Sequence, residues 1–173
     1  GDYPKALEYC NKCLNIQKIA LPEKNPHLAT SYYNVAIVHC EMKQYTKSLN
    51  YFKKCSDIEH HTLPANHPYI AFTYTHLADL HCRMQNYDKA IECSRKALKI
   101  LEFIDCNPLR LATAYLNLAD TYRELKQFQN ALKFFNKASK IRETKLSKNH
   151  PNLAILYHKL AKYYYDTGQY SIA

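Results

Sequence analysis

The sequence predicts an all-α fold, a right-handed superhelix of about eight helices arranged in antiparallel pairs. Three observations lead to this prediction. The 173-residue chain contains only two glycines, too few for tight-turn β architecture or a glycine-rich phosphate loop. Its apolar residues recur at helical spacing, and three further patterns repeat with a common period of about 42 residues. A unit of this length is long enough for two helices.

Three sets of residues mark the repeat. An aromatic residue follows a short, mainly polar pair at Tyr3, Tyr45, Tyr87, Phe128 and Tyr170. A proline follows asparagine or histidine at Pro26, Pro68, Pro108 and Pro151. A Leu-Ala pair, or Val-Ala in the first case, ends at Ala36, Ala78, Ala119 and Ala161. Because the three sets are independent and share one period, chance agreement is a poor explanation.

Each unit is predicted to contain two helices, and the first begins at the proline. Proline suits the first helical position because its missing N–H has no intrahelical partner there. The preceding Asn25 and Asn107 are strong N-caps, whereas His67 and His150 are weaker ones. The first helices are expected to end near Lys43, Gln85, Lys126 and Gly168.

The second helix is predicted to begin at the aromatic residue, and small or aromatic residues follow it at helical spacing. These positions are Ala6, Cys10 and Cys13; Ser48, Phe52 and Cys55; Ala90, Ser94 and Ala97; and Ala131, Phe135 and Ala138. Small residues at fixed places allow two helices to approach closely. Each helix pair still exposes an apolar face, which the stacking of successive pairs would bury.

We expect one continuous array. Residues 1–24 would form the second helix of a truncated leading repeat, residues 25–66, 67–106 and 107–148 three full repeats, and residues 149–173 the first helix and stub of another. Because both ends cut through a repeat and the chain starts with glycine, we expect the sequence to be a fragment of a larger protein.

The repeats resemble the tetratricopeptide repeat. Its aromatic-x2-Leu-Ala-x2-Tyr pattern is matched by Tyr115, Leu118, Ala119 and Tyr122. The second-helix pattern that follows is matched by Phe128, Ala131, Phe135 and Ala138, with Lys126 where the family favours glycine. The long unit and the Leu-x3-His-Pro linkers, at residues 63–68 and 146–151, are similar to those of the kinesin light chain subtype.

This resemblance implies a non-catalytic scaffold for protein–protein interaction, which binds a peptide segment of a partner on the concave face lined by the first helices. Counted from the alanine of each Leu-Ala pair, the groove positions lie two residues before it and one, four and five residues after it. The candidate residues are Asn34, His76, Asn117 and Lys159; Asp79, Asp120 and Lys162; Arg83 and Glu124; and Tyr33 and Tyr165.

Two asparagines match the family pattern. In kinesin light chain-like arrays, an asparagine two residues before the alanine hydrogen-bonds the backbone of an extended peptide, and Asn34 and Asn117 occupy that position. A carboxamide suits this role because it is both a donor and an acceptor. His76 and Lys159 depart from the pattern, so the asparagine ladder is incomplete.

The charges in this predicted groove indicate the type of partner. The acidic residues Glu41, Asp79, Asp120 and Glu124 predict an acidic middle, which favours a peptide of basic or mixed charge over an acidic one.

The C-terminal part of the chain is strongly basic. The chain has a formal net charge of +9, and nine of its 24 basic but only two of its 15 acidic residues follow residue 125.

Five lysines in this basic block indicate a solvated convex face on a predicted second helix. They are Lys126, Lys133, Lys137, Lys140 and Lys148, with Arg142 and Lys145 beside them. Nucleic acid is not expected as a partner, because no aromatic residues alternate with these lysines as they do in single-strand binders.

Neither a cofactor nor a metal site is expected. The seven cysteines are irregularly spaced, which is typical of reduced thiols in a cytosolic protein. Cys10 and Cys13 form a Cys-x2-Cys pair but occupy packing positions of the repeat, so they are predicted to be core residues. His39 and His81 occupy the positions of Tyr122 and Tyr164 and are likewise predicted to pack. The sequence therefore predicts no enzyme.

Two alternatives remain open. The array could be the targeting or assembly arm of a multidomain enzyme or signalling protein, such as an ADP-ribosyltransferase, because long-unit arrays also occur attached to unrelated effector domains. It could instead be a purely structural solenoid that self-associates end to end, because both ends lack a polar capping helix. No membrane-spanning segment or secretory signal is visible, so we expect a cytoplasmic protein.

Overall fold

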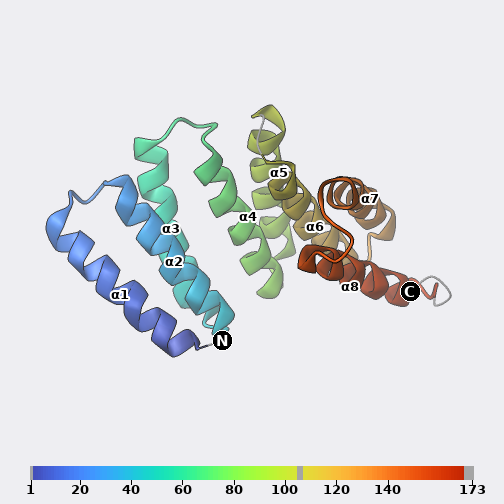
Figure 1. Cartoon of the computed structure of the whole chain (residues 1–173), viewed down its shortest axis with the longest axis horizontal. Helices are drawn as coiled ribbons and strands as arrows, with labels where there is room; N and C mark the ends of the chain where they lie inside the picture. The colour runs from blue at the N-terminus through green and yellow to red at the C-terminus, as the bar shows by residue number, and fades with distance from the viewer. Residues whose placement is uncertain (1, 105–106, 170–173) are drawn as a thin grey trace.

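A computed structural model describes residues 2–104 and 107–169, and in these residues it contains eight α-helices and no β-strand. The helices are α1 (Tyr3–Ala20), α2 (Pro26–Glu41), α3 (Tyr45–Thr62), α4 (Pro68–Arg83), α5 (Tyr87–Phe103), α6 (Pro108–Glu124), α7 (Phe128–Lys145) and α8 (Pro151–Asp166). They follow one another in chain order along the long axis (Figure 1). The all-α superhelix predicted from the sequence is thus confirmed, while the stub predicted from Tyr170 lies outside the described residues.

The first helices of the repeat are α2, α4, α6 and α8, and each begins at the predicted proline. The residue before the proline caps the helix through its side chain. The Oδ1 atoms of Asn25 and Asn107 accept the N–H of the second helical residue at 2.9 and 3.0 Å. The Nδ1 atoms of His67 and His150 accept the equivalent N–H at 3.2 and 3.1 Å. Histidine therefore serves here as asparagine does, because a neutral ring nitrogen is also an acceptor.

The first helices end where the recurring breaks in the sequence predicted, and each of them ends in a left-handed residue. Lys43, Gln85 and Lys126 have φ of 58°, 60° and 57°, and Gly168 has φ of 75°. In the first of these turns, the N–H of Gln44 donates to the carbonyl of His39 and that of Lys43 to Cys40, each at 2.9 Å. This is the Schellman arrangement, and the same two bonds recur at the other three helix ends.

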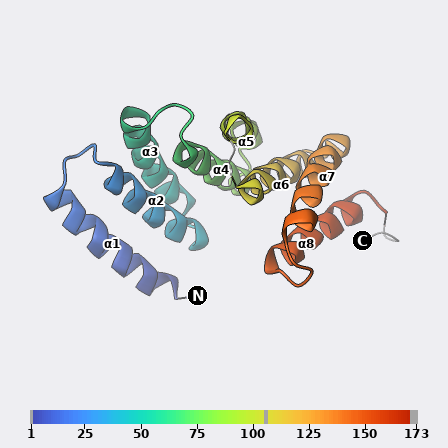
Figure 2. The same ribbon diagram turned by 45° about the horizontal axis from the view of Figure 1, so that its top comes forward.

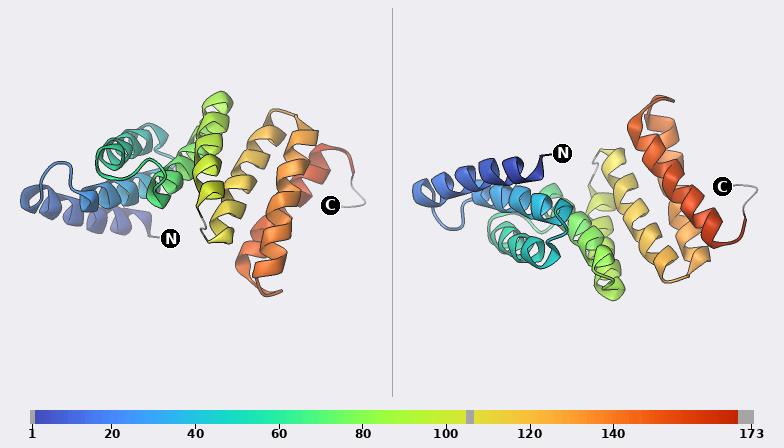
Figure 3. Two further views of the ribbon diagram at one scale, coloured as in Figure 1. Left: turned by 90° about the horizontal axis from the view of Figure 1, so that it is seen from above. Right: turned by 90° about the horizontal axis from the view of Figure 1, so that it is seen from below.

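The helices stack so that one row lies inside the other. Within the described residues, α2 contacts α4, α4 contacts α6 and α6 contacts α8, whereas no two successive second helices contact each other. In a curved array the inner row is the more crowded, so the first helices form the inner face and α3, α5 and α7 the outer one. The same elongated, curved row is visible when the molecule is turned (Figures 2 and 3).

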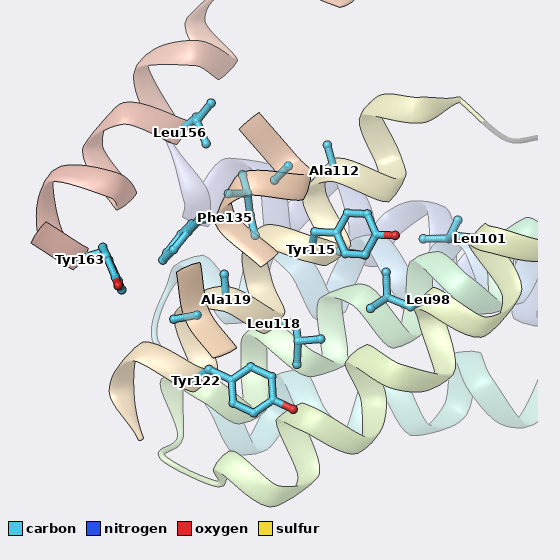
Figure 4. Packing of buried hydrophobic residues seen from close by; sticks show 14 of the residues in the cluster. Leu98, Leu101, Ala112, Tyr115, Leu118, Ala119, Tyr122, Phe135, Leu156 and Tyr163 are labelled. Carbon is cyan, nitrogen blue, oxygen red and sulfur yellow. The ribbon is translucent and has the colours of Figure 1, made fainter. Parts of the chain in front are cut away.

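Small and aromatic residues of the second helices carry the packing between the two rows. Phe52 of α3 and Phe135 of α7 are completely buried, and Phe135 lies between α6 and the Tyr163 ring of α8 (Figure 4). The other predicted positions in α3, α5 and α7 are buried as well: Ser48, Cys55, Ala90, Ser94, Ala97, Ala131 and Ala138. Ser48 also donates its hydroxyl to the carbonyl of Ala36 at 2.8 Å, which satisfies a polar atom in the core.

Helix α1 departs from this prediction. Cys13 and Ala6 are exposed and Cys10 is only half-buried, although the equivalent residues of later repeats lie in the core. The physical reason is that α1 packs on one side only, against α2. Its other face exposes apolar side chains, among them Tyr9 at 60%, Ile16 at 67% and Ile19 at 90%. By contrast, His39 and His81 are buried, as predicted for packing residues.

No helix in the described part of the chain is long and apolar enough to cross a membrane.

The left-handed helix ends provide a test of the fold. Replacing Lys43 or Gln85 with glycine should raise the free energy of unfolding by roughly 0.5–1 kcal/mol. The left-handed conformation costs a non-glycine residue about 1–2 kcal/mol, and the greater freedom of glycine in the unfolded chain cancels only part of this gain. Urea denaturation followed by circular dichroism measures the change.

Lys53→Gly is the matched control, because Lys53 is exposed in the middle of α3. It should lower the free energy of unfolding by about 1 kcal/mol. A loss of stability in Lys43→Gly would contradict the left-handed ending of α2.

Candidate functional site

The inner face formed by α2, α4, α6 and α8 contains the predicted groove residues, but they do not form one uniform surface. Tyr33 and Asn34 line a hollow between α2 and α4. His76, Asp79 and Asn117 lie in the middle, where α4 meets α6. Most of the charged candidates belong instead to a network of ion pairs between α6 and α8.

The hollow between α2 and α4 has a volume of about 210 Å³. We call it the Glu59 hollow, because a carboxyl group from α3 lies among its lining side chains. That lining consists of Thr30, Tyr33, Asn34, Glu59, Tyr69, Phe72 and Thr73. Asn34 is exposed at this place, whereas Tyr33 packs edge-on against Phe52, with ring centroids 5.8 Å apart. The hollow therefore combines aromatic surface, one exposed carboxamide and one acidic group.

Glu59 is buried to 95%, since its relative exposure is 5%. Its Oε1 accepts a hydrogen bond from the hydroxyl of Thr73 at 3.0 Å, whereas its Oε2 is buried without a partner in the described structure. Burial raises the pKa of this carboxyl group, and the neighbouring Thr73 hydroxyl and Cys55 thiol only partly offset that effect. Burial also raises the pKa of the neighbouring Tyr33 to about 12, so its phenol stays neutral.

The repeat shows that packing at this position does not require a charge. Gln17 occupies the equivalent place in α1 and accepts the hydroxyl of Ser31 at 2.7 Å, a bond of the same kind. Leu101 occupies it in α5 and is buried. Arg142 occupies it in α7, where it donates to the carbonyl of Asn152 at 2.8 Å. Glu59 could not be predicted from the sequence, because the residues at the equivalent positions of the other repeats differ so widely in character.

Two of the predicted groove residues in the middle of the inner face are engaged with the protein itself. The ring of His76 lies perpendicular to Tyr33 at 5.3 Å and stacks on Phe52 at 6.4 Å, and burial lowers its pKa. Asn117 donates from Nδ2 to the carbonyl of Thr75 at 3.2 Å, which fastens α6 to α4. Of the two asparagines that match the family pattern, Asn34 is thus the more accessible.

The charged candidates are paired with one another. Asp79 accepts from Arg83 at 2.8 Å, and Arg83 lies 3.5 Å from Glu41. Lys159 pairs with Asp120, and Lys162 lies 3.7 Å from Glu124. The sequence predicted an acidic middle from these four carboxylates, but cations on the same face balance them. Their charge therefore gives no reason to prefer a basic partner.

Arg123 is the centre of the network between α6 and α8, and the sequence analysis did not select it. Arg123 is 6% exposed, and its guanidinium pairs with Asp166, with Glu124 and, at 3.6 Å, with Asp120. It lies four residues after Ala119, the position that Tyr165 occupies in the next repeat. Applying the groove positions to every repeat would have found it.

The remaining predicted residues lie on α8 and α7. Tyr165 is exposed on α8, the helix that also carries Lys159 and Lys162 of the ion-pair network. In the basic block, Arg142 is a buried structural residue rather than a surface charge, while Lys137 lies over the Tyr115 ring at 4.9 Å. Among the described residues, no group of three or more histidine, cysteine, aspartate or glutamate side chains is placed to hold a metal ion.

Comparison with known proteins establishes the family. The sequence profile of the tetratricopeptide repeat matches residues 1–59, 27–102 and 110–173. The chain belongs to the tetratricopeptide repeat family. No curated protein sequence matches it.

Solved structures of other proteins, some of them described as kinesin light chain-like, share this fold. BtubC (BKLC) from P. vanneervenii superimposes with a TM-score of 0.81 at 20% identity, over 100% of this chain and 69% of that one. A protein from Podosopora anserina, whose nearly identical TPR-like repeats are described as those of a kinesin light chain, gives 0.75 at 22% identity, over 98% and 81%. MamA gives 0.63 at 15% identity, over 99% and 82%. At these identities the likeness shows the fold alone.

The raised pKa of Glu59 predicts a pH-dependent stability. A carboxyl group whose pKa is higher in the folded than in the unfolded protein makes folding less favourable as the pH rises from about 4 through the folded-state value. Glu59→Gln removes this effect. The variant should therefore gain stability relative to the wild type as the pH rises, by on the order of 1 kcal/mol.

Urea denaturation of both proteins from about pH 4.5 to about pH 8 measures this difference. Asp57→Asn is the control for the loss of a carboxylate from the same helix, because Asp57 is exposed on α3. A stability difference between Glu59→Gln and the wild type that does not change with pH would contradict the raised pKa of Glu59.

Proposed function

We propose that this array is a non-catalytic scaffold that binds a peptide segment of a partner protein on its inner face. The observation that carries the proposal is the Glu59 hollow, which opens on that face beside the exposed side chain of Asn34. An extended peptide needs hydrogen bonds for its backbone and recesses for its side chains. Asn34 supplies a donor and an acceptor, and the hollow supplies a recess.

The carbonyl and amide groups of Asn34 would pair with one peptide unit of the ligand. Asn117 would contribute its Oδ1, because its Nδ2 already holds the Thr75 carbonyl. Tyr165, exposed on α8, extends the same face toward the C-terminal end. The paired charges between them would set the position of the ligand rather than attract one sign of charge.

Selection from a random peptide library on the immobilised array tests this proposal. Peptides that bind the wild type should bind Asn34→Ala at least about fivefold more weakly, because two hydrogen bonds to the ligand backbone are lost. Fluorescence anisotropy with the selected peptides measures the affinities, and circular dichroism establishes that the variant is equally helical.

Asn50→Ala is the matched control, because Asn50 is exposed on the outer helix α3. It should leave the affinity unchanged. If Asn34→Ala binds as well as the wild type while Asn50→Ala does not, the working surface is the outer face.

The exposed apolar face of α1 favours a second candidate function, the self-association of the array. Ile16 and Ile19 lie three residues apart on this helix and are 67% and 90% exposed. A second copy of the chain could bury both, as the preceding helices bury Ile58, the residue of α3 equivalent to Ile16.

Light scattering over a range of protein concentrations tests this second candidate. The wild type should form dimers or longer assemblies as the concentration rises, and Ile16→Lys with Ile19→Lys should stay monomeric, because a charge on the apolar face opposes its burial. A wild type that is monomeric at every concentration excludes self-association through α1.

A further inference from the structure

The Glu59 hollow contains an unused acceptor. Glu59 is buried to 95%, and its Oε1 is engaged by the Thr73 hydroxyl, while its buried Oε2 has no partner in the described residues. A buried acceptor left unpaired lowers stability, so such atoms are rare in folded proteins. The equivalent Gln17 shows that a neutral side chain can make the same structural hydrogen bond. The charge of Glu59 is therefore available for something other than packing.

The side chains around this carboxyl group are aromatic. Tyr33 of α2 and Tyr69 and Phe72 of α4 line the hollow, and the Tyr69 ring is 56% exposed. Aromatic faces attract cations through their electron density, and arginine in particular stacks on them. Phe72 already binds a cation in this way, because the Arg110 guanidinium of α6 lies 3.7 Å from its ring centroid.

We propose that the Glu59 hollow receives the guanidinium group of an arginine in the bound peptide, with the Glu59 carboxylate as its charge partner and the Tyr33, Tyr69 and Phe72 rings around it. This proposal rests on the peptide-binding function proposed above. Asn34, at the same hollow, would hold the adjoining peptide backbone. The volume of about 210 Å³ exceeds the roughly 150 Å³ of a cavity that holds benzene, so a guanidinium fits.

The groups around Glu59 favour arginine over other ligands. Thr73, the Cys55 thiol and the Tyr33 phenol are neutral, because burial raises the pKa of both Cys55 and Tyr33 to about 12. Arg110 is the nearby fixed cation, but it stacks on Phe72 and leaves Oε2 unpaired. An acidic ligand would meet a like charge. A planar guanidinium can stack flat on a ring while two of its N–H groups donate to the carboxylate, whereas an ammonium group has neither the flat face nor the paired donors.

Arginine binding should be linked to the release of a proton. Burial biases the empty carboxyl group toward its neutral form, and a bound cation favours the carboxylate. The affinity for an arginine peptide should therefore rise with pH through the titration of Glu59 and then level off. A peptide in which neutral citrulline replaces arginine should show no such rise.

Heteronuclear NMR with three short probes tests the proposal: acetyl-Ser-Arg-Ser-amide and the same peptide with citrulline or lysine in place of arginine. The arginine peptide should produce saturable shifts at Asn34, Phe72 and Thr73. The citrulline and lysine peptides should bind at least about tenfold more weakly, because each lacks either the charge or the planar fork. The same titrations at several pH values give the proton linkage.

Two variants separate a ligand contact from a structural effect. Glu59→Gln, which copies Gln17, should keep the fold and bind the arginine peptide at least about tenfold more weakly. Glu143→Gln is the control, because Glu143 is exposed on α7 near the Tyr157 hydroxyl, at 3.5 Å. It should bind the probe as the wild type does.

The proposal is overturned if citrulline or lysine binds as well as arginine, if Glu59→Gln keeps the wild-type affinity, or if the shifts lie away from the hollow. These results are distinct from a failure of the scaffold function. If library peptides bind through Asn34 but do not depend on Glu59, the scaffold function stands and the arginine site is wrong. If the arginine probe binds in the hollow but no library peptide binds the array, the arginine site stands and the proposed binding of a longer peptide is wrong.

Discussion

The burial of apolar surface between successive helix pairs is the interaction on which the whole structure depends. No single helix pair encloses its own core. The completely buried Phe52 and Phe135 each lie where a second helix packs against two first helices, that of its own pair and that of the next pair. Small residues such as Ala97 and Ala138 let the two rows come together. Because these contacts fix the orientation of each helix pair relative to the next, they also determine which side chains come together on the inner face.

The sequence predicted the helices well because their ends are set by local chemistry. A cap at Asn25 or a left-handed turn at Lys43 involves residues only a few positions apart. The helix starts and the buried histidines could therefore be predicted from the repeat pattern, whereas the inner position of the first helices was implied by the resemblance to the tetratricopeptide repeat. The exposed Cys13 was mispredicted because the spacing does not show that α1 packs on one side only.

The contacts of the inner face were harder to predict because they join different repeats. Asn117 reaches a carbonyl 42 residues earlier, and Arg123 pairs with an aspartate 43 residues later. These separations are close to the repeat length, so neighbouring repeats place equivalent positions side by side. The repeat period thus indicated which positions of neighbouring repeats would lie side by side. It did not indicate that the carboxylates of the inner face would form ion pairs with basic side chains. Nor could it show that the carboxyl group of Glu59 would be left with one unpaired oxygen.

The two halves of the inner face are held together by different forces. Between α2 and α4, rings such as Tyr33 and His76 pack together, and an ion pair joins Glu41 to Arg83 near the helix ends. Between α6 and α8, it is between charges, several of them partly exposed, as with Asp120 and Lys159. Dissolved salt screens exposed charges but hardly affects stacked rings. Rising ionic strength should therefore weaken the exposed pairs of Arg83 with Glu41 and of Lys162 with Glu124 first, while the ring contacts and the buried Arg123 keep neighbouring repeats in register.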